Sequence, residues 1–248
     1  MKKLSICLVV LLASVMTITA QTADEIIAKY FETIGGKDKV AQINSIKMLG
    51  KVNTQGMDLP VTMTQKAPGK QRIDFSLQGK EITQMAFDGE TGWGTNFMTM
   101  KAEKWEAEDS DMTKQEVDFP DPFLGYQEKG YEVILDGEET VDGAACHKLK
   151  MTKKPVKADG EMVDNIVYFF VDKETNVVIM SRSIGKKGQM KGMAIESFVS
   201  DYQEVNGVYF PFTITQKFNG QIGATIKIEK MEVNTDIPDA TFAFPEGK

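Results

Sequence analysis

The chain has 248 residues, a formal net charge of −7 at pH 7 and two cysteines. An acidic chain without a basic cluster is not expected to bind nucleic acid or to adhere to an anionic lipid surface. Cys146 is the only cysteine after residue 20, so the folded part cannot contain an internal disulfide. A chain of this length buries about 70–75% of its unfolded surface and needs no such crosslink.

Residues 1–20 have the layout of a secretory signal peptide. Two lysines precede an apolar run that starts at Leu4, and a small residue, Ala20, stands at the expected cleavage site. The run is shorter than the roughly 20 apolar residues of a membrane-spanning helix, and Cys7 lies too early in it to be a lipidation site at its end. We therefore expect the mature chain, residues 21–248, to be a single β domain in the periplasm, with no transmembrane span and no lipid anchor.

The mature chain is expected to open with a helix. Thr22 and Glu25 have the spacing of a capping box, in which each side chain accepts a hydrogen bond from the other residue's backbone N–H. Gly35-Gly36 ends the helical pattern, and a second short helix is predicted over residues 38–43. Five apolar residues recur at helical spacing and form one stripe, which must be buried against a neighbouring sheet. They are Ile26, Ile27, Tyr30, Phe31 and Ile34.

From Ser45 onward, apolar and polar residues alternate with a period of two, which is typical of strands with one buried face. Turn sequences such as Gln78-Gly79 and Asn206-Gly207 separate these strands at short intervals, so we expect hairpins that form an antiparallel meander. The chain has no repeated strand–helix pattern that would favour a parallel sheet. Roughly eleven strands are predicted, four within residues 45–87 and seven at about 130–136, 144–152, 163–172, 176–184, 192–203, 207–217 and 223–233.

Residues 103–128 interrupt the strand pattern. They are rich in acidic residues, and the prolines at 120 and 122 cannot continue a strand ladder. We expect a loop with a helical turn that crosses one end or one face of the sheet. Two interpretations stay open, a solvated connection or a lid over a cavity. Both allow the apolar underside formed by Phe119, Phe123, Leu124 and Tyr126.

The residues that could carry chemistry are few. Cys146 and His147 are adjacent, and neighbours on a strand point to opposite faces, so the thiol and the imidazole are not expected to share a proton. We expect His147 to lie hydrogen-bonded on the packed face. The chain lacks the ligands of a structural zinc site, an EF-hand loop, a phosphate-binding loop and a nucleophile elbow. A glycosidase-like carboxylate pair is left as a minor alternative, and we expect no enzymatic activity and no cofactor.

The apolar residues of the sheet exceed what one helix can cover. Residues 166–171 and 177–180 are apolar on both faces of their strands. Many of the chain's 15 methionines lie on predicted strand faces, where they either fill an ordinary core or line a surface that adapts to varied apolar shapes. The remaining apolar area must curl on itself, lie under a lid or enclose a hollow. A curved, incomplete barrel with an apolar interior satisfies these conditions.

Five motifs follow one another in a recognisable order: Ala23–Ile27, Phe87–Trp93, Gly143–Leu149, Ser200–Pro211 and Ile237–Pro245. In this order and spacing they resemble the LolA-like lipoprotein-carrier superfamily, in the form found among exported proteins of Bacteroidetes-type bacteria. The motifs are mostly turns and strand ends, so they specify a fold rather than a function. The resemblance implies an open antiparallel half-barrel of about eleven strands, with an N-terminal helix and a lid-like helix or loop on its concave face. Members hold lipid or lipoprotein acyl chains there, and some relatives are envelope sensors.

The leading hypothesis is therefore a periplasmic carrier of lipophilic ligands, lipoprotein acyl chains among them. The alternative is a non-enzymatic envelope sensor or protein-interaction module that holds a partner protein in the same half-barrel. The family's carriers pin a closed lid with an arginine, and neither Arg72 nor Arg182, the chain's two arginines, can be assigned that role from sequence. One apolar face of the predicted sheet is expected to bind the ligand. Its residues are Met48, Val61, Met63, Phe75, Met85, Phe87, Phe210 and Phe212.

Overall fold

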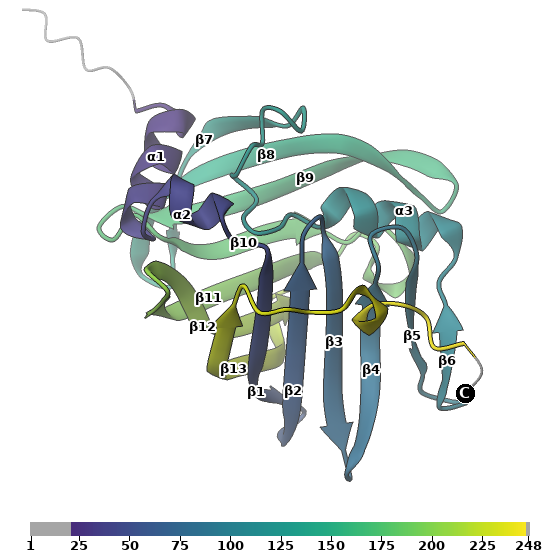
Figure 1. Ribbon diagram of the computed structural model, residues 1–248. Helices are drawn as coiled ribbons and strands as arrows, with labels where there is room; N and C mark the ends of the chain where they lie inside the picture. Colours follow the sequence, from purple (N-terminus) through teal and green to yellow (C-terminus); the bar gives the residue numbers. More distant parts are fainter. Residues whose placement is uncertain (1–20, 247–248) are drawn as a thin grey trace, which may run out of the picture.

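The computed structural model describes residues 21–246, and the predicted signal peptide lies outside them. The described part is mainly β, as the sequence predicts, and its strands form one sheet (Figure 1). Three α-helices accompany the sheet: α1 (Ala23–Thr33), α2 (Lys37–Ala41) and α3 (Ala107–Glu116). The strands are β1 (Ser45–Thr54), β2 (Met57–Lys66), β3 (Lys70–Leu77), β4 (Lys80–Phe87), β5 (Gly92–Asn96), β6 (Lys101–Lys104), β7 (Glu132–Val141), β8 (Ala144–Ala158), β9 (Glu161–Asp172), β10 (Val178–Ile184), β11 (Ala194–Val205), β12 (Val208–Phe218) and β13 (Gln221–Val233).

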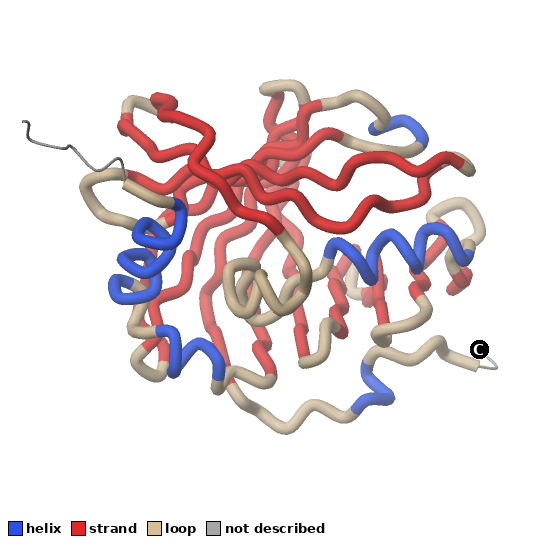
Figure 2. The backbone as a smooth tube through the Cα atoms, turned by 90° about the horizontal axis from the view of Figure 1, so that it is seen from above, coloured by secondary structure: helices blue, strands red, loops and turns tan. Residues whose placement is uncertain are grey.

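The sheet consists of two antiparallel meanders joined through their first and last strands. Its order is β6-β5-β4-β3-β2-β1-β13-β12-β11-β10-β9-β8-β7. We call β1–β6 the N-terminal arm and β7–β13 the C-terminal arm; they meet where β1 pairs with β13. The sheet curls, and the edge strands β6 and β7 do not pair with each other, so it stays open (Figures 1 and 2). The predicted open antiparallel half-barrel is confirmed.

The sheet contains 13 strands in the described residues, two more than the sequence predicted. The additional strands are β5 and β6, which are only five and four residues long. Neither alternates clearly between apolar and polar residues. Gly92 of β5 lies against the indole ring of Trp105, where a Cβ would come within 1.8 Å of a ring carbon. The close approach of this ring explains why a glycine stands at position 92, where an apolar or polar side chain would otherwise show the period-two pattern.

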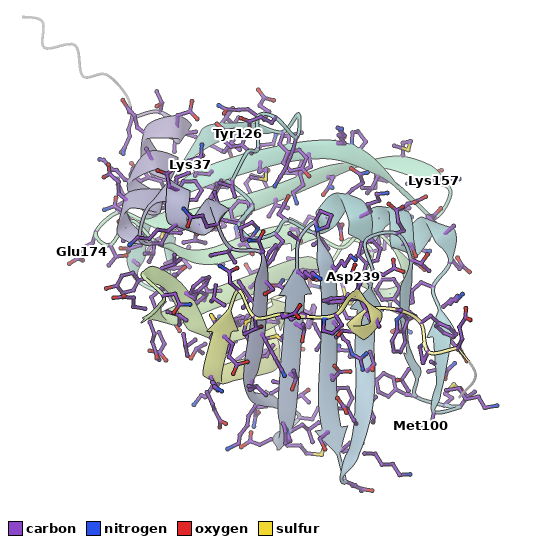
Figure 3. The ribbon with its side chains drawn as sticks, in the orientation of Figure 1. Lys37, Met100, Tyr126, Lys157, Glu174 and Asp239 are labelled. Atoms are coloured by element: carbon purple, nitrogen blue, oxygen red, sulfur yellow. The ribbon has the colours of Figure 1, made fainter. Side chains whose placement is uncertain are left out.

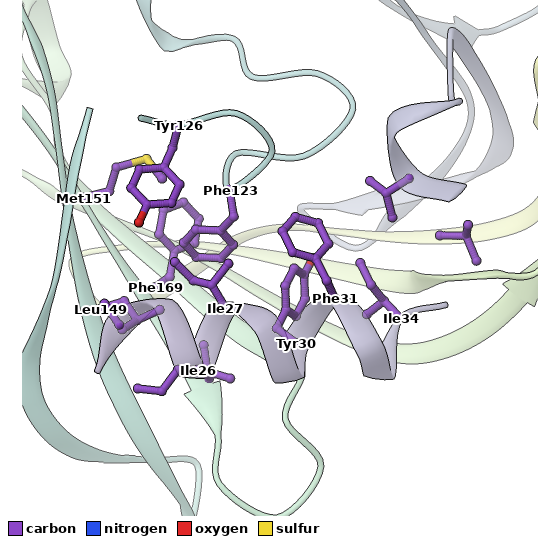
Figure 4. Close-up of a cluster of buried hydrophobic side chains, with 14 of the residues drawn as sticks. Ile26, Ile27, Tyr30, Phe31, Ile34, Phe123, Tyr126, Leu149, Met151 and Phe169 are labelled. Atoms are coloured by element: carbon purple, nitrogen blue, oxygen red, sulfur yellow. The ribbon is translucent and has the colours of Figure 1, made fainter. Parts of the chain in front are cut away.

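Helix α1 forms as the sequence predicts. The Thr22 hydroxyl accepts from the Glu25 backbone N–H at 3.3 Å, and the Glu25 carboxylate accepts from the Thr22 N–H at 2.9 Å. The helix then lays its apolar stripe on the concave face of the C-terminal arm, against β8 and β9 (Figure 4). The buried cluster consists of Ala23, Ile26, Ile27, Tyr30, Phe31, Ile34, Val40, Ile43, Ile46, Phe123, Tyr126, Leu149, Met151, Phe169, Val171 and Val208.

The outer face of the N-terminal arm is covered by residues 235–246, which we call the C-terminal strap. Arg72, on the face opposite Ile73, donates to the Thr241 carbonyl at 2.7 Å. The Trp93 indole N–H donates to the Phe242 carbonyl at 2.9 Å. Asp239 forms one ion pair with Lys66, at the end of β2, and another with Lys70, at the start of β3. Figure 3 labels Asp239 on the strap, in front of the upright strands. The strap leaves the concave face free for other contacts.

Residues 105–131 connect β6 to β7, and we call them the crossing segment. Because β6 and β7 are the two opposite edges of the sheet, this connection has to cross the open side of the half-barrel. Figure 2 shows α3 and the loop after it between the two arms. The predicted helical turn is a ten-residue helix. Acidic residues in its first turn interact favourably with the helix dipole. The helix ends at Glu116, shortly before the prolines at 120 and 122, which cannot continue it.

Candidate functional site

Two adjoining apolar cavities lie on the concave face beneath the crossing segment. The first has a volume of about 300 Å³ and lies between α1, α2 and strands β9–β12. The second has a volume of about 240 Å³ and lies over β1–β3. Both are lined by Pro120 of the crossing segment and by Phe210, Pro211 and Ile214 of β12. We call the two together the groove; the larger cavity alone is at the lower limit of the roughly 300–1,000 Å³ typical of small-molecule sites.

The eight predicted ligand-binding residues share the concave face but not one site. Met48, Met63 and Phe210 line the groove, and Phe210 belongs to both cavities. Val61 and Phe212 are buried in a second hydrophobic cluster with Ile228, where they act as core. Phe75, Met85 and Phe87 lie further along the N-terminal arm and line neither cavity. Of these three, Phe87 is almost fully buried and Phe75 stacks on Phe97, with ring centroids 6.1 Å apart.

Sequence reasoning missed most of the groove's wall in the C-terminal arm. The missed residues come from α1, from strands β9–β12 and from the crossing segment, which only the fold brings together. The strand residues have a signal, since they are apolar or aromatic residues within the predicted strands. The helix residues were predicted to be buried but not to face a cavity. The missed lining residues include Tyr30, Ile34, Pro120, Asp121, Phe169, Val178, Val199, Tyr202 and Ile214.

Buried polar groups lie at the rim where α1 meets the crossing segment. The Tyr30 hydroxyl donates to the Asp121 carboxylate at 2.6 Å, and the Phe123 backbone N–H donates to the other oxygen at 2.8 Å. Burial raises the pKa of Asp121 to about 6, although these hydrogen bonds and Lys129 favour its charged form. Burial and the nearby Asp121 raise the pKa of Tyr30 well above its ordinary value. The Tyr202 hydroxyl, which also faces the first cavity, donates to the Val178 carbonyl at 2.7 Å.

Helix α3 is held to the C-terminal arm by charged groups rather than by apolar contacts. Ser110 is its only buried residue. The Glu108 carboxylate accepts from the backbone N–H groups of Asp159 and Gly160, in the β8–β9 turn, at 2.8 and 3.1 Å. Lys187, in the β10–β11 connection, pairs with Asp109 at 2.7 Å and also lies near Glu108. A cover attached in this way can separate from the sheet without exposing a large apolar area.

The other side of α3 contacts the N-terminal arm. The Gly92 backbone N–H donates to the Ser110 hydroxyl at 3.0 Å, and Lys114 pairs with Glu90 at 2.6 Å. Helix α3 therefore bridges the two arms. The two arginines serve elsewhere: Arg72 holds the C-terminal strap, and Arg182 pairs with Glu139 and Glu196.

The adjacent Cys146 and His147 point to opposite faces, as predicted. Cys146 is fully buried with Phe170 on the outer face, whereas His147 shares the concave side with Leu149. The expectation that His147 is hydrogen-bonded is wrong, because its Nδ1 atom is buried without a hydrogen-bond partner in the described residues, 3.9 Å from a Glu138 oxygen. Burial and the positive charge of Lys173 lower its pKa, so the ring is neutral at pH 7.

Two other features have no candidate among the described residues. No group of three or more His, Cys, Asp or Glu residues within 21–246 has an arrangement that could hold a metal ion. Within the same residues, no helix combines the length and the apolar character needed to cross a membrane.

Comparison with solved structures defines the class of fold. A LolA superfamily protein from Nitrosomonas europaea is 12% identical in sequence and superposes with a TM-score of 0.54, over 90% of this chain and 98% of that one. A structure described as an outer membrane lipoprotein-sorting protein domain, from Vibrio parahaemolyticus, is 10% identical with a TM-score of 0.56, over 88% and 94% of the two chains. At these identities the likeness concerns the fold alone. The curled open sheet with its covered concave face is a LolA-like fold.

The family follows from the sequence comparison. A family model whose description reads "-like: Uncharacterized protein" matches residues 96–244, and the chain belongs to that family. No curated protein sequence matches the chain. The matched range includes α3, the rest of the crossing segment and the whole C-terminal arm, which together form most of the first cavity's wall.

Proposed function

We propose that this protein binds lipophilic ligands in the groove and carries them, acyl chains of lipids or lipoproteins being the class that fits best. The observation that carries the proposal is the pair of adjoining apolar cavities on the concave face, which share Pro120 of the crossing segment and Phe210, Pro211 and Ile214 of β12. The hypothesis of a hollow half-barrel requires unfilled space on the concave face, and the two cavities support it. The names of the two similar structures, which mention LolA and lipoprotein sorting, agree with this class of ligand.

The size of the hydrophobic effect is suited to a carrier. Each buried CH₂ group contributes about 0.8 kcal/mol, so a chain of about ten buried methylenes gains roughly 8 kcal/mol. Association costs about 4–15 kcal/mol in lost freedom and ordering. One acyl chain would thus bind weakly and reversibly, and a ligand with several chains would bind more tightly. A protein that delivers its cargo needs reversible binding.

The proposal also includes the cellular location of the protein and the lid over the groove. The sequence of residues 1–20 favours export, so we place the mature chain, residues 21–248, in the periplasm, where it would move lipophilic molecules through water. The crossing segment would act as the lid, because it contributes Pro120 to both cavities and has few buried apolar contacts along α3. Opening would then admit a chain from the side of the half-barrel that the crossing segment spans.

Native mass spectrometry tests the proposal directly. The mature protein is purified from the periplasm of its producing cells without detergent and is measured before and after incubation with diacylglycerol and with a synthetic triacylated lipopeptide. We expect a bound mass in the range of lipids, or uptake of at least one added lipid at a one-to-one ratio. A protein that is uniformly ligand-free and takes up neither lipid would rule out the carrier function.

A further inference from the structure

A third cavity, of about 330 Å³, lies on the same concave face beyond the groove. The C-terminal half of α3 covers it, through Met112 and Glu116, and the β10–β11 connection closes one side, through Lys186 and Met190. Its floor consists of residues of β8–β11. We call it the polar pocket, because its floor includes Lys153, Asn165 and Ser183.

The polar pocket continues the groove along three neighbouring strands. Ser181 pairs with Phe169 on one side and Ser197 on the other, and all three line the groove. The next row on the same face is Ser183, which pairs with Val167 and Ile195, and these three line the polar pocket. Two residues along a strand span about 7 Å. A ligand of ordinary length can therefore occupy both sites at once.

Asn165 is the unusual group in the polar pocket. Its side chain is only 1% exposed, and neither its amide nitrogen nor its amide oxygen has a hydrogen-bond partner among the described residues. A buried carboxamide without partners costs free energy, and folded proteins satisfy the large majority of such groups. Asn165 also interrupts an apolar strand face, between Val163 and Val167. Asn165 lines the pocket, and both the donor and the acceptor of its carboxamide lack a partner among the described residues.

The charged groups around the pocket are already paired. Lys186 contacts Glu116 at 2.6 Å, and both residues line the pocket. Lys153 pairs with the buried Asp118 and donates to the Glu116 carbonyl at 3.0 Å. Lys187 binds Asp109 of α3. A carboxylate or a phosphate would have to displace one of these partners, whereas a neutral polar group needs only the hydrogen bonds that Asn165 offers.

We propose that the polar pocket binds the neutral polar headgroup of a ligand whose apolar chain lies in the groove, and that Asn165 recognises a group that both donates and accepts a hydrogen bond, such as a carboxamide. This assignment rests on the proposed function of the groove. Asn165 donates from its amide nitrogen to the ligand's carbonyl and accepts the ligand's N–H on its amide oxygen. A headgroup that lacks the N–H leaves the Asn165 oxygen unpaired, so the pocket discriminates against it.

The test compares ligands that differ only in the head. Dodecanamide, N,N-dimethyldodecanamide and dodecanoate each compete with the fluorescent probe N-phenyl-1-naphthylamine for the delipidated mature protein. We expect dodecanamide to bind about tenfold more tightly than the other two, as one or two net hydrogen bonds would give. In Asn165→Leu this preference should disappear while N,N-dimethyldodecanamide binds as before. Asn53→Leu is the matched control, because Asn53 is exposed on β1 and lies outside the polar pocket and the groove.

The outcomes separate the two proposals. If the wild type binds all three ligands equally, or if Asn165→Leu keeps the preference for dodecanamide, the role of Asn165 is overturned and the groove remains a chain-binding site. If the wild type binds none of the three and does not take up the fluorescent probe, the proposed function fails and the role of Asn165 fails with it. Circular dichroism of each variant establishes that it is folded before its affinities are compared.

Discussion

The hydroxyl of Tyr30 on α1 donates a hydrogen bond of 2.6 Å to the carboxylate of Asp121 in the crossing segment. The two residues are 91 positions apart, and both line the first cavity of the groove. Through this contact the N-terminal helix positions the loop that covers the groove. Because burial raises the pKa of Asp121 to about 6, the Asp121 carboxyl changes its charge close to neutral pH.

The first prediction concerns stability and pH. The folded protein retains the Asp121 proton up to about pH 6, whereas the unfolded chain releases it near 3.8. The bound proton therefore adds its full contribution to the free energy of unfolding below pH 3.8, and this contribution is lost as the pH rises to about 6. It amounts to about 3 kcal/mol. Asp121→Asn removes the titration and keeps a neutral hydrogen-bonding group beside Tyr30. We expect the variant to gain stability relative to the wild type as the pH rises from 4 to 7.

Urea unfolding of both proteins at pH 4.5, 6 and 7.5 measures this difference. The comparison between variants is needed because other groups titrate as well. The pKa of Asp172 is lowered by its hydrogen bonds with Thr175, so its contribution runs in the opposite direction and is lost as the pH falls. It is common to both proteins and cancels. A stability difference between wild type and Asp121→Asn that stays constant with pH would contradict the raised pKa.

The second prediction concerns the charged attachment of α3. Lys187 lies within 3.6 Å of Glu106, 3.4 Å of Glu108 and 2.7 Å of Asp109. Lys187→Gln leaves these three carboxylates without their lysine, so α3 should separate from the β10–β11 connection more often. We expect faster amide hydrogen exchange across residues 107–116 and faster release of bound lipid. Added salt should reduce the difference between variant and wild type, because it weakens the same ion pairs in the wild type.

Lys191→Gln is the matched control for the second prediction. Lys191 belongs to the same connection and pairs with the Asp159 side chain at 3.0 Å, whereas Glu108 of α3 is bound by the Asp159 backbone N–H. Lys191→Gln should leave the amide hydrogen exchange of α3 and the release of lipid at wild-type rates. Equal acceleration by both substitutions would mean that the connection as a whole had loosened, and no acceleration by Lys187→Gln would mean that its ion pairs do not hold the cover.

The third prediction tests whether the groove is the binding site. Ile214 of β12 lines both cavities, so Ile214→Trp should fill their junction. We expect the affinity for a fluorescent fatty acid to fall by about tenfold or more, with the β structure retained. Ile222→Trp is the control, because Ile222 is 67% exposed on β13. An Ile214→Trp protein that is folded and binds the fatty acid as the wild type does would place the ligand elsewhere.

The sequence predicted the strands of the sheet well because one face of each is buried and the alternation is regular. It also predicted α1, whose cap is local: Thr22 and Glu25 interact across three residues. The crossing segment was harder. Its path depends on β6 and β7 being opposite edges of the sheet, which follows from the pairing of β1 with β13, a contact between the two ends of the chain. No local pattern encodes that pairing.

The prediction of the binding site was incomplete for a related reason. Met63 and Val61 have the same strand pattern as Met48, yet Val61 packs into a filled cluster while Met48 and Met63 border a cavity. Alternation identifies the concave face, but whether a side chain there meets a neighbour or a hollow depends on the curvature of the whole sheet. Asn165 was detectable in principle, as a polar residue on an apolar strand face. Its free carboxamide becomes evident only in three dimensions.

The fourth prediction concerns the cost of Asn165 to the ligand-free protein. Replacement of a buried, unpaired carboxamide by an apolar side chain of similar size removes its desolvation penalty. Asn165→Leu should therefore stabilise the delipidated protein by about 1–3 kcal/mol, measured as a higher urea midpoint at an unchanged slope. A saturating concentration of dodecanamide should reverse the order, because only the wild type gains the two hydrogen bonds on binding. If Asn165→Leu is instead less stable without ligand, the carboxamide already has partners in the folded protein and is a structural residue rather than a recognition residue.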